Sequence, residues 1–255
     1  MSAAALKMVR TFVVGAAAAF ALLQSVAAAA QPAPPRQERV TFAKGATSAT
    51  IKGQMKGDAD VDYIVRAAAG QTLTVALKGS NRSHYFNVLP PGSADVAMYV
   101  GQDGGHFTGM LPADGDYKVR VYLMRNAARR SEVSNYELTV TVTGQALAPL
   151  PASKDALLPG TPFHASASIA CLPMPYGDTK PQRCEAFVIR RGAGGTATVE
   201  IPSKGFTRRI LFVEGKPVAS DSAEQMTVAR KGDVTIVKFE SGEYYEIVDA
   251  MIFGG

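Results

Sequence analysis

Apolar and polar residues alternate along much of the first half of the chain, in short segments separated by turn residues. Such alternation over about four to eight residues is typical of a strand with one buried face. Turn-forming residues separate the segments, as in Pro90-Pro91-Gly92 and Ala113-Asp114-Gly115-Asp116. About seven or eight short strands at this spacing predict an antiparallel β-sandwich. The strand candidates are Ser48–Lys56, Val61–Arg66, Thr72–Leu77, Tyr85–Leu89, Tyr117–Tyr122 and Tyr136–Val142.

The second half of the chain repeats this pattern and predicts a second, small antiparallel β domain. Residues 146–160, between the halves, mix Pro, Gly and Ala without a strand period and are expected to form a linker. The sequence therefore predicts an all-β protein with domains at residues 39–145 and 161–255. The strand candidates of the second domain are Thr196–Ile201, Arg208–Val213, Gln225–Ala229, Val234–Phe239 and Tyr244–Val248.

The first thirty residues have the features of a secretory signal peptide. Lys7 and Arg10 precede a short apolar stretch, and Ser25–Ala30 supplies the small residues of a cleavage site. An uncleaved anchor is the alternative, but it needs about 20 apolar residues, a length reached here only by counting polar ones. We expect cleavage after residues 1–30, a proline-rich extended tether at residues 31–38, and export to a bacterial periplasm.

The charge balance argues against a nucleic-acid partner. Removing residues 1–30, which carry Lys7, Arg10 and no acid, lowers the formal net charge from +5 to +3. Residues 40–146 carry 11 basic and 9 acidic side chains, and residues 150–255 carry 12 of each. Neither half has the basic excess that binding to a phosphate backbone requires.

The two cysteines, Cys171 and Cys184, are expected to form a structural disulfide in an oxidising compartment. The alternative is a reactive thiol pair, but the two residues lack the close spacing of a redox motif. In the chain-entropy model, closing a loop of this length stabilises the fold by about 3 kcal/mol.

Catalytic and metal-binding motifs are missing from the sequence. It contains neither the GxSxG of a serine hydrolase nor the HExxH of a zinc enzyme. His84, His106 and His164 are scattered and are expected at strand ends or on the surface. Asp58, Asp60 and Asp62 could offer oxygens to calcium, but the glycine and distal glutamate of a calcium loop are lacking, which favours a solvated turn. We expect no catalytic residue, no metal and no cofactor.

The segment Leu111–Arg130 carries the strongest functional signal. A tight turn leads into a strand with Tyr117, Val119 and Val121 on one face and Lys118, Arg120 and Tyr122 on the other. The chain then leaves the sheet with three arginines close together, Arg125, Arg129 and Arg130. Arg125 and Arg129 are four residues apart, which would place both on one side of a helical turn. Such a pair suits bidentate binding of carboxylates, whereas the alternative is a solvated, salt-bridged loop.

The run LPADGDYKVRVYLMRNAAR, with VDYIVRAAAGQTLTVAL and YFNVLPPG before it, resembles the bacterial periplasmic inhibitors of g-type (goose-type) lysozyme. The resemblance covers roughly residues 40–145 and implies a small antiparallel β-sandwich that performs no reaction. It also implies that Arg125 and Arg129 enter the lysozyme cleft. We include Arg130 and Tyr122 among the expected partner-binding residues. The family uses an aromatic residue on a neighbouring loop, where this chain has acids in the turn Lys56-Gly57-Asp58-Ala59-Asp60.

The second domain resembles an uncharacterised module at the C-terminus of bacterial exported proteins, through the run YEIVDAMIFGG at residues 245–255. Adjacent residues of a strand face opposite sides, so one of Tyr244 and Tyr245 is expected in the core, and Phe253 is expected to pack there too. The resemblances favour a protein that binds and inhibits g-type lysozyme. The alternative is a non-inhibitory envelope module that binds peptidoglycan or another surface polymer. A hydrolase is a third class, which would need a polar constellation in a cleft.

Overall fold

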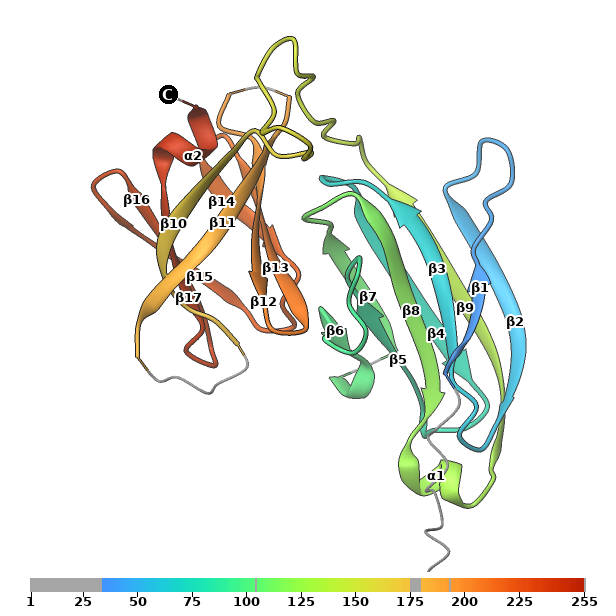
Figure 1. Cartoon of the computed structure of the whole chain (residues 1–255). Coiled ribbons are helices and arrows are strands. Elements are labelled where there is room, and N and C mark those ends of the chain that lie inside the picture. Colours follow the sequence, from blue (N-terminus) through green and yellow to red (C-terminus); the bar gives the residue numbers. More distant parts are fainter. Residues whose placement is uncertain (1–33, 104, 175–179, 193, 255) are drawn as a thin grey trace, which may run out of the picture. The chain divides into compact units, whose positions relative to one another are not determined.

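The computed structural model describes residues 34–103, 105–174, 180–192 and 194–254 (Figure 1). The expected signal peptide, residues 1–30, and the first part of the expected tether lie outside the described residues. Strands dominate the described chain, which confirms the predicted all-β class. No helix among the described residues is long and apolar enough to cross a membrane.

Two sheets form the sandwich of the N-terminal half (Figure 1). The five-stranded sheet consists, in spatial order, of β1 (Arg36–Arg39), β3 (Val61–Ala67), β8 (Gly115–Leu123), β5 (His84–Leu89) and β6 (Tyr99–Val100). The four-stranded sheet consists of β2 (Ser48–Lys56), β9 (Val133–Thr143), β4 (Thr72–Gly79) and β7 (His106–Met110). A 3-10 turn, η1 (Gly101–Asp103), follows β6, and a short helix, α1 (Arg125–Arg129), joins β8 to β9.

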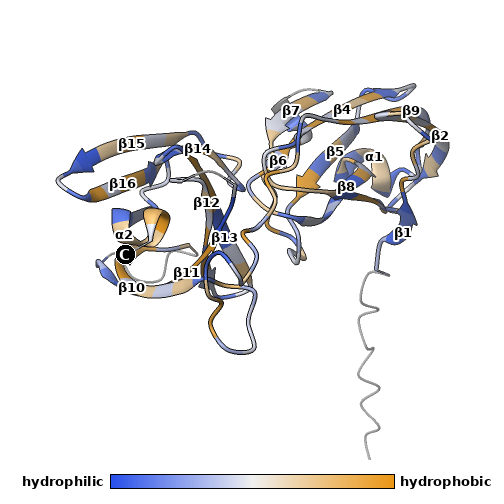
Figure 2. Cartoon of the chain, turned by 90° about the horizontal axis from the view of Figure 1, so that it is seen from above, coloured by the Kyte–Doolittle hydropathy of each residue, from blue (hydrophilic) through white to orange (hydrophobic). Residues whose placement is uncertain are grey.

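Alternation along the strands builds the hydrophobic core between these sheets (Figure 2). In β8, the predicted inward face of Tyr117, Val119 and Val121 is buried, while the alternate residues are partly exposed. Side chains from both sheets complete the core. The hydroxyls of Tyr63 on β3 and Tyr136 on β9 share a hydrogen bond of 2.6 Å, which joins the two sheets inside it.

The edges of the sandwich differ from the sequence prediction. β1 pairs in parallel with β3, so the sandwich is not wholly antiparallel. This strand includes the last residues of the stretch expected to be a tether. β7 was not predicted either, because its five residues, HFTGM, have an exposed glycine-containing pattern with few β-branched residues.

The C-terminal half forms one eight-stranded sheet around its own core. Its strands are, in spatial order, β14 (Lys216–Ser220), β13 (Phe206–Val213), β12 (Ala197–Ser203), β11 (Gln182–Arg190), β10 (Ala165–Leu172), β17 (Tyr244–Val248), β16 (Val234–Phe239) and β15 (Met226–Lys231). The helix α2 (Asp249–Phe253) follows β17 and buries Met251 and Ile252 in this core. The expectation for Phe253 was wrong, because its side chain is 56% exposed. Of the two tyrosines, Tyr245 is fully buried.

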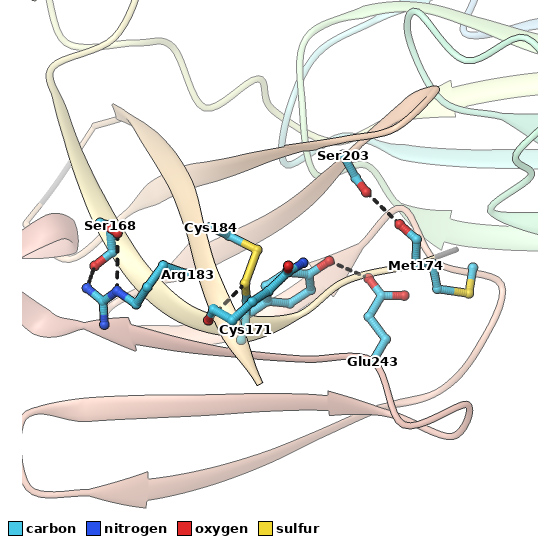
Figure 3. Close-up of a disulfide and its surroundings, with 9 residues drawn as sticks. Ser168, Cys171, Met174, Arg183, Cys184, Ser203 and Glu243 are labelled. Carbon is cyan, nitrogen blue, oxygen red and sulfur yellow. Dashed lines mark hydrogen bonds between the residues drawn. A yellow bond between two sulfur atoms is a disulfide. The ribbon is translucent and has the colours of Figure 1, made fainter. Parts of the chain in front are cut away.

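The predicted disulfide is present between Cys171 on β10 and Cys184 on β11 (Figure 3). The two Cα atoms are 5.9 Å apart, and both residues belong to the hydrophobic core of the C-terminal sheet. β10 and β11 pair from Ala165 to Cys171, so the disulfide reinforces a hydrogen-bonded ladder.

Replacing both cysteines by alanine should lower the free energy of unfolding of the C-terminal core by about 3 kcal/mol, because the unfolded chain regains the entropy of the open loop. Hydrogen exchange resolved by peptide should show faster exchange in β10 and β11. Peptides from the N-terminal sandwich are the internal control and should not change. Equal protection of β10 and β11 in the variant would contradict a stabilising role for the disulfide.

Candidate functional site

The helix α1 lies beyond the end of β8, at one end of the N-terminal sandwich (Figure 1). Its five residues, Arg125 to Arg129, form a helical turn within the segment that the sequence predicts as an arginine-bearing loop. The β2–β3 turn and the β4–β5 loop lie beside it, as shown by hydrogen bonds from the Gly57 amide to the Glu132 carbonyl and from the Met124 amide to the Ser83 carbonyl. We call these three segments, residues 57–60, 80–83 and 124–132, the α1 end of the sandwich.

Burial of Ala127 determines how α1 is oriented. Ala127 is 0% exposed and belongs to the hydrophobic core of the sandwich. Successive helical residues are rotated by about 100°, so residues two positions before and after Ala127 point about 160° away from it. Those residues are Arg125 and Arg129, and both are exposed. The buried alanine therefore directs the two arginines into solvent on the same side of the helix.

The three arginines of this segment are in different electrostatic situations. Arg125 and Arg129 have no hydrogen bond or ion pair from their guanidinium groups to any residue that the structure describes. Arg130, in contrast, donates from Nε to the Glu132 carboxylate at 2.6 Å. The other Glu132 oxygen accepts from the side-chain nitrogen of Asn81 at 2.7 Å. Hydrogen bonds from Asn81 and then Arg130 lower the pKa of Glu132 below its ordinary value, so Glu132 remains charged beside Arg130.

The backbone around α1 is also held in place. The Arg130 and Glu132 amides both donate to the Ala127 carbonyl, and the Ser131 amide donates to the Ala128 carbonyl. Ser131 adopts a φ of 52°, in the left-handed region that often ends a helix. With the bond from Gly57 to Glu132, these contacts fix both the helix end and the turn beside it. The arginines thus project from an ordered support.

A hollow of about 460 Å³ separates α1 from the β2–β3 turn. It is lined by Asp58, Arg125, Ala128, Arg129 and Ser131. Asp58 is exposed, and its carboxylate has no ion pair within 4.0 Å among the described residues. The acid of the turn therefore lies on the same hollow as the two free guanidinium groups.

Asp60 in the turn and Asp62 on β3 differ from the solvated acids that the sequence predicts. Asp62 is 1% exposed and binds Arg120 through both carboxylate oxygens, at 2.7 and 3.1 Å. Burial raises the pKa of Asp60 above its ordinary value, although the nearby Arg120 lowers it. Within the described residues, no group of three or more His, Cys, Asp or Glu side chains could hold a metal ion.

Tyr122 lies on the outward face of β8, two residues before the start of the helix segment at Met124. Its side chain is half-buried, and its hydroxyl donates to the Asn87 side-chain oxygen at 3.1 Å. Its ring lies 6.3 Å from that of Tyr85, the residue opposite it on β5. Tyr122 is thus placed on the flank of the sandwich and not on the hollow.

His84 lies at a strand end, as the first residue of β5, but sequence reasoning missed that it is buried beneath the α1 end. Its Nδ1 lies 2.8 Å from the Ser134 hydroxyl, and its ring packs edge-on against Tyr136. The Ser134 hydroxyl in turn accepts a hydrogen bond from the backbone amide of Asn81. Because the Asn81 side chain donates to Glu132, His84 is linked to the contacts that hold Glu132. Burial lowers the pKa of His84 to about 4, which makes it neutral at physiological pH. Its position at the start of a strand was the available signal.

Comparison with known proteins points to one family. No family model matches the chain. The curated "Inhibitor of g-type lysozyme" of Escherichia coli (strain K12) is 31% identical over 106 residues, which are 40% of this chain and 78% of that protein. Among solved structures, the periplasmic inhibitor of g-type lysozyme from Aeromonas hydrophila is 38% identical and is similar over 42% of this chain and 96% of its own, with a TM-score of 0.41. The inhibitor from Salmonella Typhimurium is 30% identical over 42% of this chain and 98% of its own, with a TM-score of 0.34.

The buried His84 should make the sandwich sensitive to acid. The folded pKa of about 4 lies below the ordinary value of 6.5, so the unfolded chain takes up the proton first. The stabilisation is complete above pH 6.5 and is lost as the pH falls toward 4, by up to roughly 3 kcal/mol. Urea unfolding of the wild type and of His84→Gln across this pH range should show a flatter profile for the variant. Parallel profiles would mean that His84 does not titrate differently in the folded state.

Proposed function

We propose, because this chain belongs to the family of inhibitors of g-type lysozyme, that its N-terminal sandwich binds a g-type lysozyme and blocks the substrate cleft. In this proposal the protein acts in the periplasm as a binding protein, after cleavage of residues 1–30, and catalyses no reaction. Residues 39–145 form the inhibitor domain, and residues 161–255 form a separate module.

The observation that carries this proposal is the pair of exposed, unpaired guanidinium groups of Arg125 and Arg129 on a fixed helical turn. A glycosidase cleft contains a general-acid carboxyl group, often with a second acid nearby. Guanidinium groups bind carboxylates bidentately, which gives both strength and a defined geometry. Because the backbone that carries the arginines is already ordered, only their side chains lose conformational freedom on binding, so more of the interaction energy contributes to affinity.

The two other expected contact residues have supporting roles in this proposal. Arg130 keeps its ion pair with Glu132, which fixes the end of α1, and so it acts mainly as a positioning residue. Tyr122 contacts the enzyme outside the cleft, where a half-exposed tyrosine can bury its ring and keep its hydroxyl bonded to Asn87. The hollow between α1 and Asp58 would receive a group from the rim of the cleft.

Replacing Arg125 and Arg129 together by alanine should abolish inhibition, because each truncation leaves an enzyme carboxylate without its partner. Losses of about 2 kcal/mol or more per charged contact imply at least a hundredfold rise in the inhibition constant. The assay is lysis by purified g-type lysozyme, with the thermal unfolding midpoint measured in parallel to show that the sandwich stays folded.

Lys44→Ala is the matched control, since Lys44 is an exposed cation in the loop that precedes β2, at the opposite end of that strand. It should inhibit like the wild type. Sedimentation with insoluble peptidoglycan separates binding to the enzyme from coating of its substrate. Unchanged inhibition by the double variant would reject the arginine site.

Neutralising Asp58 should strengthen the complex at low ionic strength. Its free carboxylate lies on the hollow with both arginines and opposes an incoming acid. We expect Asp58→Asn to raise the association rate about two- to fivefold, with the gain disappearing as salt screens surface charges. Surface plasmon resonance at two ionic strengths measures this. Weaker binding by the variant would show that Asp58 instead accepts a hydrogen bond from the enzyme.

A further inference from the structure

We infer that Arg82, on the β4–β5 loop, is a third arginine of the enzyme-binding surface, and that Asn81 is the residue that positions it. This inference rests on the proposed function and extends it from the cleft to the acidic groups around its rim. Nothing in the sequence motif of the α1 segment points to Arg82, which lies more than forty positions earlier in the chain.

Hydrogen bonds attach the Arg82 loop to the α1 segment. The Met124 amide donates to the Ser83 carbonyl at 2.9 Å. Ser83 directly follows Arg82, and Met124 directly precedes Arg125. With 3.8 Å between consecutive Cα atoms, the Cα atoms of Arg82 and Arg125 can be at most about 15 Å apart. Both lie at the same end of the sandwich, and one partner surface could contact them together.

Asn81 holds the loop through each of its polar groups. Its side-chain nitrogen donates to Glu132 at 2.7 Å, and its side-chain oxygen accepts from the Ser83 amide at 2.8 Å, closing a turn around Arg82. Its own amide donates to the Ser134 hydroxyl at 3.3 Å. The loop therefore has little freedom left to lose on binding, although it carries an exposed side chain at its tip.

The positive charge around Arg82 indicates that the partner surface is acidic. Arg82 is exposed, and its guanidinium group has no ion pair with any residue in the described part of the chain. Lys56 and Lys78, at the ends of β2 and β4, are likewise exposed and unpaired among the described residues. With these two flanking lysines, the α1 end of the sandwich presents more free cations than acids. Such a surface attracts carboxylates and accelerates association with an acidic partner.

The test is the binding of the full mature chain to purified g-type lysozyme, measured by surface plasmon resonance at low and high salt. Arg82→Gln should weaken binding about five- to tenfold at low salt, mainly through slower association, and less at high salt. Lys44→Gln removes the same charge at the other end of β2 and should stay within about twofold of the wild type.

Asn81→Ala should weaken binding more when Arg82 is present than in the Arg82→Gln background, where only the loss of its contact with Glu132 at the end of α1 still acts. A purely structural role for Asn81 would instead weaken binding equally in both backgrounds. An effect of Arg82→Gln no larger than that of Lys44→Gln would overturn the inference. If the Arg125→Ala, Arg129→Ala variant then still loses inhibition, the proposed function stands without Arg82. If the wild type does not bind lysozyme, both fail.

Discussion

The methyl group of Ala127 lies in the hydrophobic core of the N-terminal sandwich, and the orientation of α1 follows from that contact. A helix of five residues is too short to be stable alone, because so few hydrogen bonds do not offset the free-energy cost of helix nucleation. Tertiary packing must therefore hold it. Once Ala127 is buried, helix geometry leaves Arg125 and Arg129 no direction but solvent. The same small side chain that closes the core also presents the charged groups.

A column of buried polar side chains lies inside the sandwich next to its α1 end. It runs from the Tyr63–Tyr136 hydrogen bond through the ring of His84 to Ser134. Burying such groups is costly unless they find partners, and here each hydroxyl has one, whereas Nε2 of His84 has none among the described residues. The column fixes the relative position of the two sheets where α1 and the β4–β5 loop leave them. Rigidity at the surface thus originates in directional contacts inside the core.

The sequence revealed the local features of this architecture well. Alternation located most strands, and the four-residue spacing of Arg125 and Arg129 is the one that places both on one side of α1. It could not reveal contacts between distant residues. Asp62 looked like a solvated turn acid until Arg120, 58 positions away, was found to bind it. Asn81 and Glu132 are 51 positions apart, yet the Asn81 side chain donates to the same carboxylate that pairs with Arg130. Periodicity reports which side of a strand is buried, but not which strand lies opposite.

The charged groups at the α1 end fall into two sets with separate tasks. Arg130, Glu132 and Asn81 satisfy one another and hold the backbone, so removing one would alter the support. Arg125, Arg129 and Asp58 line the hollow, and none of them pairs with another described residue. Free surface charges contribute little to folding, so their identity is open to change by selection for a partner. The Asp58 carboxylate beside the two arginines weakens their attraction for any acidic partner surface. The loss of affinity is smallest for a partner that places a hydrogen-bond donor opposite Asp58. Because specificity is a difference between affinities, Asp58 can improve discrimination among targets while it lowers the average affinity.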